Sequence, residues 1–266
     1  MKVVLITGAS SGLGKSIGEY LLTKGHSVFG TSRNPSKYPD SKFPLIAMDV
    51  RDVSGINACV AEVISKTGGI DVLVNNAGVG ILGPLEEIPT DEIRNHFEVN
   101  LYGPIEVMKA VLPQMRLQKS GQIINITSIA GYTGLPFRSV YSAGKGALEL
   151  LSEGIRMEVK SFGIDISCLA PGEFATNIAD GRYYAPQSAE SAYAEVYGRT
   201  IDLINSQVNA GDDPILVAQA VSAIINQHKP KIHYKVGPFM SRLSIVLKRI
   251  LPDKVYERIL MNHYKL

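Results

Sequence analysis

A tyrosine and a lysine stand four residues apart at Tyr141 and Lys145, a pairing that could support proton transfer. If residues 140–162 form a helix, both side chains project from one face of it. An isolated phenol is a poor base at neutral pH, and a nearby ammonium group favours its ionised form. The pair could therefore give a proton to a carbonyl oxygen or take one from an alcohol. An ordinary amphipathic helix face is the alternative, because such pairs are common on helices.

Ser128 lies thirteen residues before Tyr141, directly after an apolar run that we expect to form a strand at residues 122–127. In an open parallel sheet, ligands bind outside the carboxyl ends of the strands. The Ser128 hydroxyl could therefore hold the same oxygen atom that exchanges a proton with Tyr141. Side chains that can act on the same substrate atom and lie at one edge of a sheet indicate an active site.

A glycine-rich turn near the N-terminus predicts a nucleotide site. It follows an apolar run and precedes a helical pattern, and its sequence is Thr7-Gly8-Ala9-Ser10-Ser11-Gly12-Leu13-Gly14. Such a turn lets backbone N–H groups approach a pyrophosphate at the N-terminus of a helix, where the helix dipole favours an anion. A glycine triplet alone is a weak signal, but its place between strand and helix strengthens it.

The end of the second predicted strand, residues 27–32, bears on the choice of cofactor. An acidic residue there would bind the ribose 2′-hydroxyl of NAD, whereas an arginine would accommodate the 2′-phosphate of NADP. This chain has Ser32 and Arg33 at that point. A guanidinium pairs well with a phosphate, so we expect NADP(H) to be favoured over NAD(H). The alternative is that Arg33 is a solvated loop residue.

The elements that must position these residues alternate along the chain. Short, nearly continuous apolar runs are typical of parallel strands covered on both faces. We expect strands at residues 2–7, 27–32, 45–48, 71–75, 122–127, 165–169 and 231–236. We expect helices at residues 14–24, 53–66, 90–118, 140–162 and 214–227. The pattern predicts an α/β fold with a single doubly wound parallel β-sheet of the Rossmann type, flanked by helices.

Four motifs in this order resemble those of the short-chain dehydrogenase/reductase family. They are the glycine turn, Asn75-Asn76-Ala77-Gly78, Ser128 with the Tyr141–Lys145 segment, and Pro171-Gly172 with Thr176. The resemblance reaches to about residue 237, and the longer tail looks more like the hydroxysteroid and retinol dehydrogenase branch. It implies Asn100, Ser128, Tyr141 and Lys145 as catalytic residues, with Asn100 completing a proton relay through water. A helix-capping or turn role for Asn100 stays open.

The same resemblance implies the residues that hold the dinucleotide. Asp49 and Val50 resemble the family's adenine contact, and Lys145 would also hold the nicotinamide ribose. The full expected set of cofactor contacts is Gly8, Ser10, Ser11, Gly12, Leu13, Gly14, Arg33, Asp49, Val50, Asn76, Ala77, Gly78, Tyr141, Lys145, Pro171, Gly172 and Thr176. Glu173 departs from the small or apolar residue often seen after this Pro-Gly, and the sequence gives no account of its charge.

The net charge of +2 divides unevenly along the chain. Residues 227–266 carry nine Lys/Arg and two acidic residues, a net charge of +7, which leaves −5 on the rest. Basic amphipathic helices can lie on membrane surfaces, so this tail could make weak contact with a membrane. Packing of the tail on the parent domain is the commoner outcome. No motif that reads bases accompanies the charge, so we expect no nucleic-acid partner.

Composition excludes several classes of protein. Hydrophobic residues make up 45% of the chain and exclude a disordered protein, while two cysteines, Cys59 and Cys168, exclude a secreted disulfide scaffold. Neither a signal peptide nor a membrane span is visible, and the histidines lack the spacing of a metal site. We therefore expect a cytoplasmic protein without a metal, which could form a homodimer.

We expect one Rossmann-type domain over residues 1–266, with a helical substrate lid at about 173–210 and a helical extension at about 238–266. Four lid tyrosines and two nearby residues could line the substrate pocket. They are Tyr183, Tyr184, Tyr193, Tyr197, Leu135 and Phe137.

The predicted function is that of an NADP(H)-dependent oxidoreductase acting on CH–OH groups. It would interconvert a carbonyl and a secondary alcohol on a fairly apolar small molecule, such as a steroid, a retinoid or another lipid. A β-ketoacyl-thioester reductase is the alternative enzyme, although those chains end soon after the last strand. A dinucleotide-binding sensor or scaffold is the non-enzymatic alternative, but it would have no chemical need for Ser128, Tyr141 and Lys145.

Overall fold

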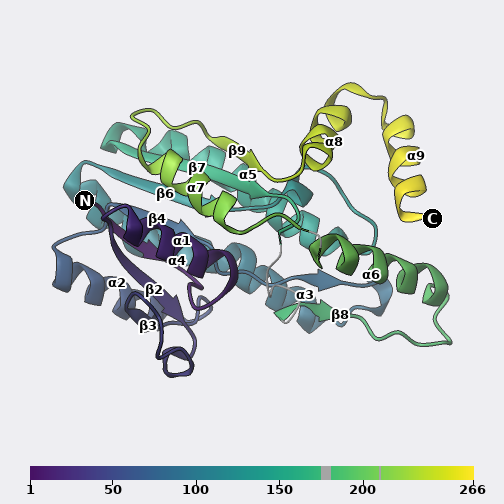
Figure 1. Cartoon of the computed structure of the whole chain (residues 1–266), viewed down its shortest axis with the longest axis horizontal. Helices are drawn as coiled ribbons and strands as arrows, with labels where there is room; N and C mark the ends of the chain where they lie inside the picture. The colour runs from purple at the N-terminus through teal and green to yellow at the C-terminus, as the bar shows by residue number, and fades with distance from the viewer. Residues whose placement is uncertain (175–180, 210) are drawn as a thin grey trace.

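Seven parallel strands form one sheet in the computed structural model, which describes residues 1–174, 181–209 and 211–266. The strands are β1 (Val3–Ile6), β2 (Ser27–Ser32), β3 (Leu45–Ala47), β4 (Val72–Asn75), β6 (Gly121–Ile126), β7 (Ile164–Pro171) and β9 (His233–Val236). Their order is β3-β2-β1-β4-β6-β7-β9. All seven expected strands are confirmed, and with them the doubly wound Rossmann-type sheet (Figure 1).

Helices cover both faces of the sheet, which explains why its strands are continuous apolar runs. In β1, Val4 and Ile6 pack on one layer and Leu5 packs on the other, and all three are fully buried. The first layer contains α1 (Gly12–Thr23) and α7 (Ile215–Ile225). The second contains α2 (Val53–Thr67), α4 (Gly103–Gln118) and α5 (Ser139–Val159). A strand buried on both sides has no solvent-facing position that would favour a polar residue.

The helix expected at residues 90–118 is interrupted, which corrects that prediction. The chain forms α3 (Thr90–Phe97), a π-helical turn at Glu98–Tyr102, and then α4. The N–H of Gly103 donates to the carbonyl of Glu98, five residues back instead of four. Pro104 follows and has no N–H with which to continue the regular ladder. Such single π turns are frequent at functional sites, and this one contains Asn100.

The lid region forms a small core of its own beside the sheet. It contains β5 (Ile81–Leu82), β8 (Tyr183–Tyr184) and α6 (Ala194–Asn209). Tyr197 is 1% exposed, and its hydroxyl donates to the carbonyls of Leu82 and Ala185. Phe137 packs its ring against Tyr193 and Tyr197. The prediction that these aromatic residues face a ligand is therefore wrong, because they fill this core instead.

The tail beyond β9 forms two short helices, α8 (Phe239–Ile250) and α9 (Asp253–Tyr264). Figure 1 shows them at the end of the molecule away from the N-terminus. Pro252 precedes α9 and marks its start, as expected for a residue that favours the beginning of a helix. The remaining short helices are η1 (Pro35–Lys37), η2 (Leu85–Glu87), η4 (Ile129–Tyr132) and η5 (Lys160–Phe162). Across the described residues, no helix is long and apolar enough to span a bilayer.

Candidate active site

One pocket of about 1300 Å³ runs along the carboxyl ends of the strands, where a doubly wound sheet binds its ligands. It brings together most of the predicted site residues, namely Gly8, Ser10, Ser11, Gly12, Leu13, Arg33, Asp49, Val50, Asn76, Ala77, Gly78, Asn100, Ser128, Tyr141, Lys145, Pro171 and Gly172. Gly14 is buried behind the glycine turn, and Thr176 lies outside the described residues.

Lys145 is the buried cation of this pocket, with 6% of its surface exposed. Its Nζ donates to the carbonyl oxygen of Ile126, the last residue of β6, at 3.0 Å. Burial in the wall of α5 lowers the pKa of Lys145 to about 8. A Cβ atom added to Gly78 would lie 3.5 Å from Nζ, so the loop after β4 closes over the same group.

Tyr141 lies one helical turn before Lys145 on α5 and contributes to the pocket wall. Ser128 follows β6 and caps the short helix η4, where its Oγ accepts a hydrogen bond from the N–H of Ala130 at 3.1 Å. A serine hydroxyl can accept and donate at the same time. The cap therefore fixes the Ser128 oxygen while leaving its hydrogen to meet a ligand atom in the pocket.

Asn100 braces the π turn against the loop that follows β4. Its Nδ2 donates to the carbonyls of Val79 and His96, and its Oδ1 accepts from the N–H of Val79 at 3.3 Å. A Cβ atom on Gly78 would lie 2.8 Å from Asn100 Oδ1. The turn role that the sequence left open is therefore present in the fold. Participation of Asn100 in a proton relay stays a prediction.

His96 was not among the predicted site residues, yet it lies directly behind them. It is 1% exposed, its Nδ1 is 3.1 Å from Asn100 Nδ2, and its ring centroid is 5.8 Å from that of Tyr141. Burial and the nearby Lys145 charge lower its pKa to about 4. At neutral pH His96 is therefore uncharged, and its Nδ1 can accept from Asn100. The sequence did not indicate a role for His96, because its neighbours in the fold are Asn100 and Tyr141 and not other histidines at a metal-site spacing.

The glycine turn is held in place by side chains from β2 and from the loop after β4. Gly8 and Gly12 adopt left-handed backbone angles, with φ of +63° and +53°, which other residues rarely adopt. The side chain of Asn76, after β4, donates to the carbonyl of Gly8 at 3.0 Å. Thr31 in β2 accepts from the N–H of Gly8 through its Oγ1 at 3.2 Å. The loop is thus fixed before any ligand binds.

The N-terminus of α1 fits the phosphates of a dinucleotide. Ser11 stands at the cap position but its side chain makes no cap hydrogen bond, and the first turn of α1 contains no acidic residue. The first N–H groups of a helix need an acceptor, and the helix dipole favours a negatively charged one. Arg33 lines the same pocket after β2, so the chain offers a second positive group for an anion.

Asp49 and Arg51 form an ion pair at the pocket rim. The shortest contact joins Arg51 Nη2 to Asp49 Oδ2 at 2.6 Å, and the hydrogen bond from Arg51 holds the pKa of Asp49 below its usual range. Asp49 is therefore charged at neutral pH and already engaged. Its neighbour Val50 is 8% exposed and presents an apolar surface to the pocket.

Glu173 finds its partner in the tail. Its Oε2 accepts a hydrogen bond from the Oγ of Ser241 in α8 at 2.8 Å, and both residues line the pocket. The N–H of Gly172 donates to the carbonyl of Val236 at 2.8 Å, which ties the end of β7 to the end of β9. The charge that the sequence left unexplained therefore anchors α8 beside the site.

The tail packs on the parent domain and supplies a large part of the pocket wall. The contributing residues are Met240, Ser241, Ser244, Leu247, Tyr256, Ile259, Leu260, His263 and Tyr264. Arg138, just before α5, donates to the hydroxyl of Tyr264 and stacks near its ring. This contact joins residues 126 positions apart, so no local pattern could have revealed it.

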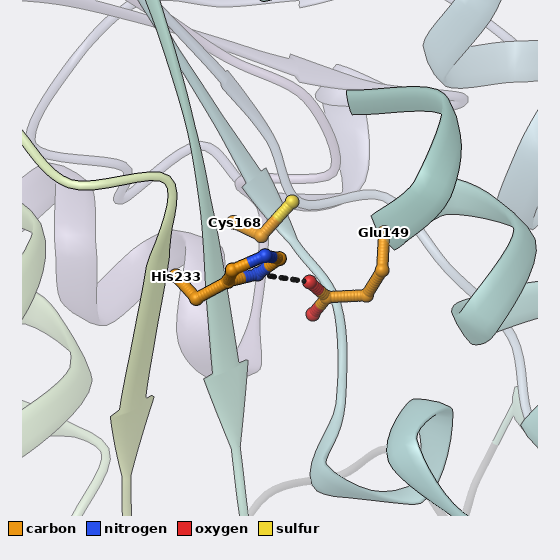
Figure 2. Close-up of side chains that lie close together, drawn as sticks. All are labelled: Glu149, Cys168 and His233. Carbon is orange, nitrogen blue, oxygen red and sulfur yellow. Dashed lines mark hydrogen bonds and ion pairs between the residues drawn. The ribbon is translucent and has the colours of Figure 1, made fainter. Parts of the chain in front are cut away.

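A second polar cluster lies beneath Lys145, one turn further along α5. Glu149 is buried and accepts hydrogen bonds from Thr127 Oγ1 at 2.5 Å, from the Tyr132 hydroxyl and from His233 Nδ1. Figure 2 shows His233, Glu149 and Cys168 converging from β9, α5 and β7. Their ligand atoms lie within 4.8 Å of one another, close enough for a metal ion.

Hydrogen bonds already engage this cluster, and burial raises the pKa of the Cys168 thiol, which disfavours the thiolate that metals prefer. The expected absence of a metal stays a prediction. The sequence signal for such a cluster is weak, because its members come from three separate elements.

A family model for short chain dehydrogenases matches residues 2–185. This chain belongs to the short-chain dehydrogenase family. It is therefore an oxidoreductase that uses a nicotinamide dinucleotide and a small-molecule substrate. The hydroxysteroid and retinol branch that the tail suggested stays a prediction.

Two curated members of the family match this chain along almost its whole length. The 3-ketodihydrosphingosine reductase of Bacteroides thetaiotaomicron is 37% identical over 264 residues, which cover 99% of this chain and 98% of that protein. The NADPH-dependent 3-dehydrocapnine reductase of Ornithobacterium rhinotracheale is 29% identical over 284 residues, which cover 100% of this chain and 98% of that protein. Both matches include the tail, so these family members share its length.

A solved structure also matches the entire chain. A short-chain dehydrogenase from Streptomyces avermitilis is 35% identical and superposes with a TM-score of 0.83. The match covers 100% of this chain and 97% of that protein. The fold assigned from the sheet order is therefore that of a solved family member.

Proposed function

We propose that this family member is an NADP(H)-dependent oxidoreductase that interconverts a ketone and a secondary alcohol. The observation that carries the proposal is the meeting of Ser128, Tyr141 and Lys145 with the glycine turn in one pocket. A sensor or scaffold would need the glycine turn but not these three side chains. The bound nicotinamide supplies or accepts the hydride, and the protein must position the substrate and move the proton.

In this proposal, the Tyr141 hydroxyl gives its proton to the substrate oxygen in reduction and takes it back in oxidation. Ser128 donates to the same oxygen and fixes its position. Lys145, a buried cation held by Ile126, holds the nicotinamide ribose. Asn100 links the proton path to water, supported by its place in a π turn behind the pocket.

The cofactor site follows from the same pocket. We propose that the N-terminus of α1 and the turn formed by Gly8, Ser10, Ser11, Gly12, Leu13 and Gly14 hold the pyrophosphate. Asp49 and Val50 hold the adenine, and Asn76, Ala77 and Gly78 hold the adjoining ribose region. Pro171, Gly172 and Thr176 frame the nicotinamide.

Arg33 supports a preference for NADP(H) over NAD(H). It lines the pocket directly after β2, and no carboxylate stands at Ser32 to favour a free ribose hydroxyl. The 3-dehydrocapnine reductase, which is named as NADPH-dependent, points in the same direction. The Asp49 carboxylate is not free to bind a ribose 2′-hydroxyl, because it pairs with Arg51.

We further propose a long apolar substrate that bears a ketone near a polar end. The tail adds apolar side chains to the wall of the pocket that holds the catalytic residues, Met240, Leu247 and Leu260 among them. The name of the 37% identical relative indicates a ketone on a long-chain base as its substrate. A β-ketoacyl thioester is the second candidate, and the shared tail length favours the first.

A substrate panel tests this proposal. We would measure NADPH consumption with 3-ketodihydrosphingosine, a 3-ketosteroid, a retinal and acetoacetyl thioester as separate substrates. The proposal expects the long-chain ketone to give the highest kcat/KM. Faster turnover of the thioester would favour the alternative enzyme, and no NADPH consumption with any ketone would favour the sensor.

The remaining predictions complete the picture of the molecule. We propose that residues 1–266 act as one domain, with 173–210 as the lid and 238–266 as part of the substrate wall. A homodimer, a cytoplasmic location and the absence of nucleic-acid partners stay predictions.

A further inference from the structure

The two tail helices expose an apolar surface on the side away from the protein body. On α8, Phe239, Val246 and Ile250 are 67%, 50% and 68% exposed. These residues and Leu243 follow the spacing of one helical face, four and then three residues apart. Large apolar side chains gathered on one exposed face indicate an interaction surface, whereas single ones do not.

The other faces of α8 already have partners. Ile245 is 2% exposed and packs with Ile129 and Ala170 of the main body. Ser244 and Leu247 line the active-site pocket. The outward row of apolar side chains is therefore needed neither for packing nor for the pocket wall.

Helix α9 continues the same arrangement. Val255 and Met261 are 46% and 42% exposed, and neither lines the pocket. Leu260 and Tyr264 of the same helix face the pocket. Each tail helix thus has one side in the substrate pocket and apolar residues in solvent, so the two helices separate the pocket from the outside.

Positive charge lies beside this surface. Residues 238–266 contain six Lys/Arg and two acidic residues, a net charge of +4. Arg242 and Arg249 are exposed and lie on α8 beside the apolar row. Apolar side chains flanked by basic ones are typical of helices that lie in the interface of a membrane.

We propose that the tail face, defined as Phe239, Leu243, Val246, Ile250 and Val255 with the flanking arginines, docks on an anionic lipid bilayer. Charge complementarity favours this occupant over a second copy of the chain, because a two-fold contact would bring two segments of charge +4 together. Docking would place the pocket wall against the lipid, so that an apolar substrate reaches the site without crossing water.

Vesicle co-sedimentation tests the docking directly, with Val246→Asn/Ile250→Asn as the test variant. Neither residue lines the pocket. The matched control is Val53→Asn/Leu117→Asn on α2 and α4, whose side chains are 49% and 78% exposed. The probe is a vesicle of equal parts phosphatidylcholine and phosphatidylglycerol at low salt, with a pure phosphatidylcholine vesicle as the uncharged comparison.

We expect the wild type and the control to bind the anionic vesicles and the test variant to bind them at least about tenfold more weakly, because two apolar contacts with lipid are lost. Arg242→Glu/Arg249→Glu should weaken binding to a similar degree, and added salt should weaken wild-type binding. Wild type that stays in solution at low salt would overturn the proposal, as would equal binding by test variant and control.

A second measurement separates this inference from the proposed function. Docking itself does not depend on that function, and only the entry of an apolar substrate from the lipid rests on it. All three variants should reduce a water-soluble ketone as fast as the wild type, because the catalytic residues are unchanged. Loss of docking with that activity intact supports the proposal. A change in oligomeric state of the test variant in place of a change in vesicle binding would assign the tail face to a second copy and overturn it.

Discussion

Arg33 is the residue on which the cofactor preference depends, and its neighbours explain why. The strand before it ends on Ser32, which carries no charge to oppose a phosphate, and Asp49, just after the next strand, is paired with Arg51. A 2′-phosphate at this point would therefore meet the Arg33 guanidinium, while the charge of the nearby Asp49 is balanced by Arg51. Such a charge-assisted contact is stronger than one between neutral groups.

Replacing Arg33 with alanine should raise the KM for NADPH at least about tenfold and leave the KM for NADH nearly unchanged, since a hydrogen bond to a charged group contributes roughly 1.5–3 kcal/mol. Steady-state kinetics with both cofactors would measure this. Lys42→Ala is the control, because Lys42 is a nearby exposed cation that pairs with Glu19. Equal increases for both cofactors would contradict the assignment.

Single residues of the site were predictable where chemistry and spacing coincide. Ser128, Tyr141 and Lys145 were found from residue type and strand position, and the pocket brings them together. His96 and Arg138 were not found, because their partners lie on other elements and no local spacing marks them. The roles of the lid tyrosines were mistaken, because an aromatic residue in a lid can serve a core as well as a ligand.

The glycine turn illustrates how one element constrains another. A Cβ atom on Gly14, in the first turn of α1, would lie 2.5 Å from the carbonyl oxygen of Gly8 and 2.5 Å from Asn76 Nδ2. Contacts this short force the backbone to shift. Helix α1 can therefore approach the loop after β4 only because residue 14 is glycine.

We expect Gly14→Ala to lower the free energy of unfolding by about 1–3 kcal/mol, the usual cost of overpacking, and to weaken NADPH binding. Chemical denaturation and fluorescence titration would measure the two effects. Gly154→Ala on α5 is the matched control, because nothing lies within 4 Å of its added Cβ. That change should stabilise the helix by roughly 0.5–1 kcal/mol. Similar stability in both variants would refute the packing argument.

The elements themselves were largely predictable, and the exceptions have physical causes. Strands buried on both faces give long apolar runs, which is why all seven were found. The interruption at Glu98–Tyr102 was missed, because a π turn keeps the helical periodicity on both sides. The two-residue strands β5 and β8 are too short to show any pattern.

For the whole molecule, His96 links stability to pH. Its pKa is about 4 in the fold and 6.5 as the reference value, so the unfolded chain binds more protons between these pH values. Stability therefore rises with pH through this window and is lost as pH falls from about 6.5 to 4. The shift corresponds to at most about 3 kcal/mol.

Replacing His96 with asparagine should flatten this acid slope, because an amide oxygen can still accept from Asn100 but cannot take up a proton. Denaturant unfolding at several pH values would measure the slope, with His228→Asn, an exposed histidine, as the control. A variant that keeps the full wild-type slope would show that other groups cause it.

If Tyr141 moves a proton while NADPH gives the hydride, loss of the Tyr141 hydroxyl should stop turnover and leave the cofactor bound. The rate of NADPH consumption with a ketone would be compared for wild type, Tyr141→Phe and the control Tyr234→Phe, a β9 residue outside the pocket. Binding of NADPH would be measured in parallel. We expect a loss of at least about 100-fold in kcat for Tyr141→Phe, with NADPH binding and the control unchanged. Full turnover by Tyr141→Phe would contradict it.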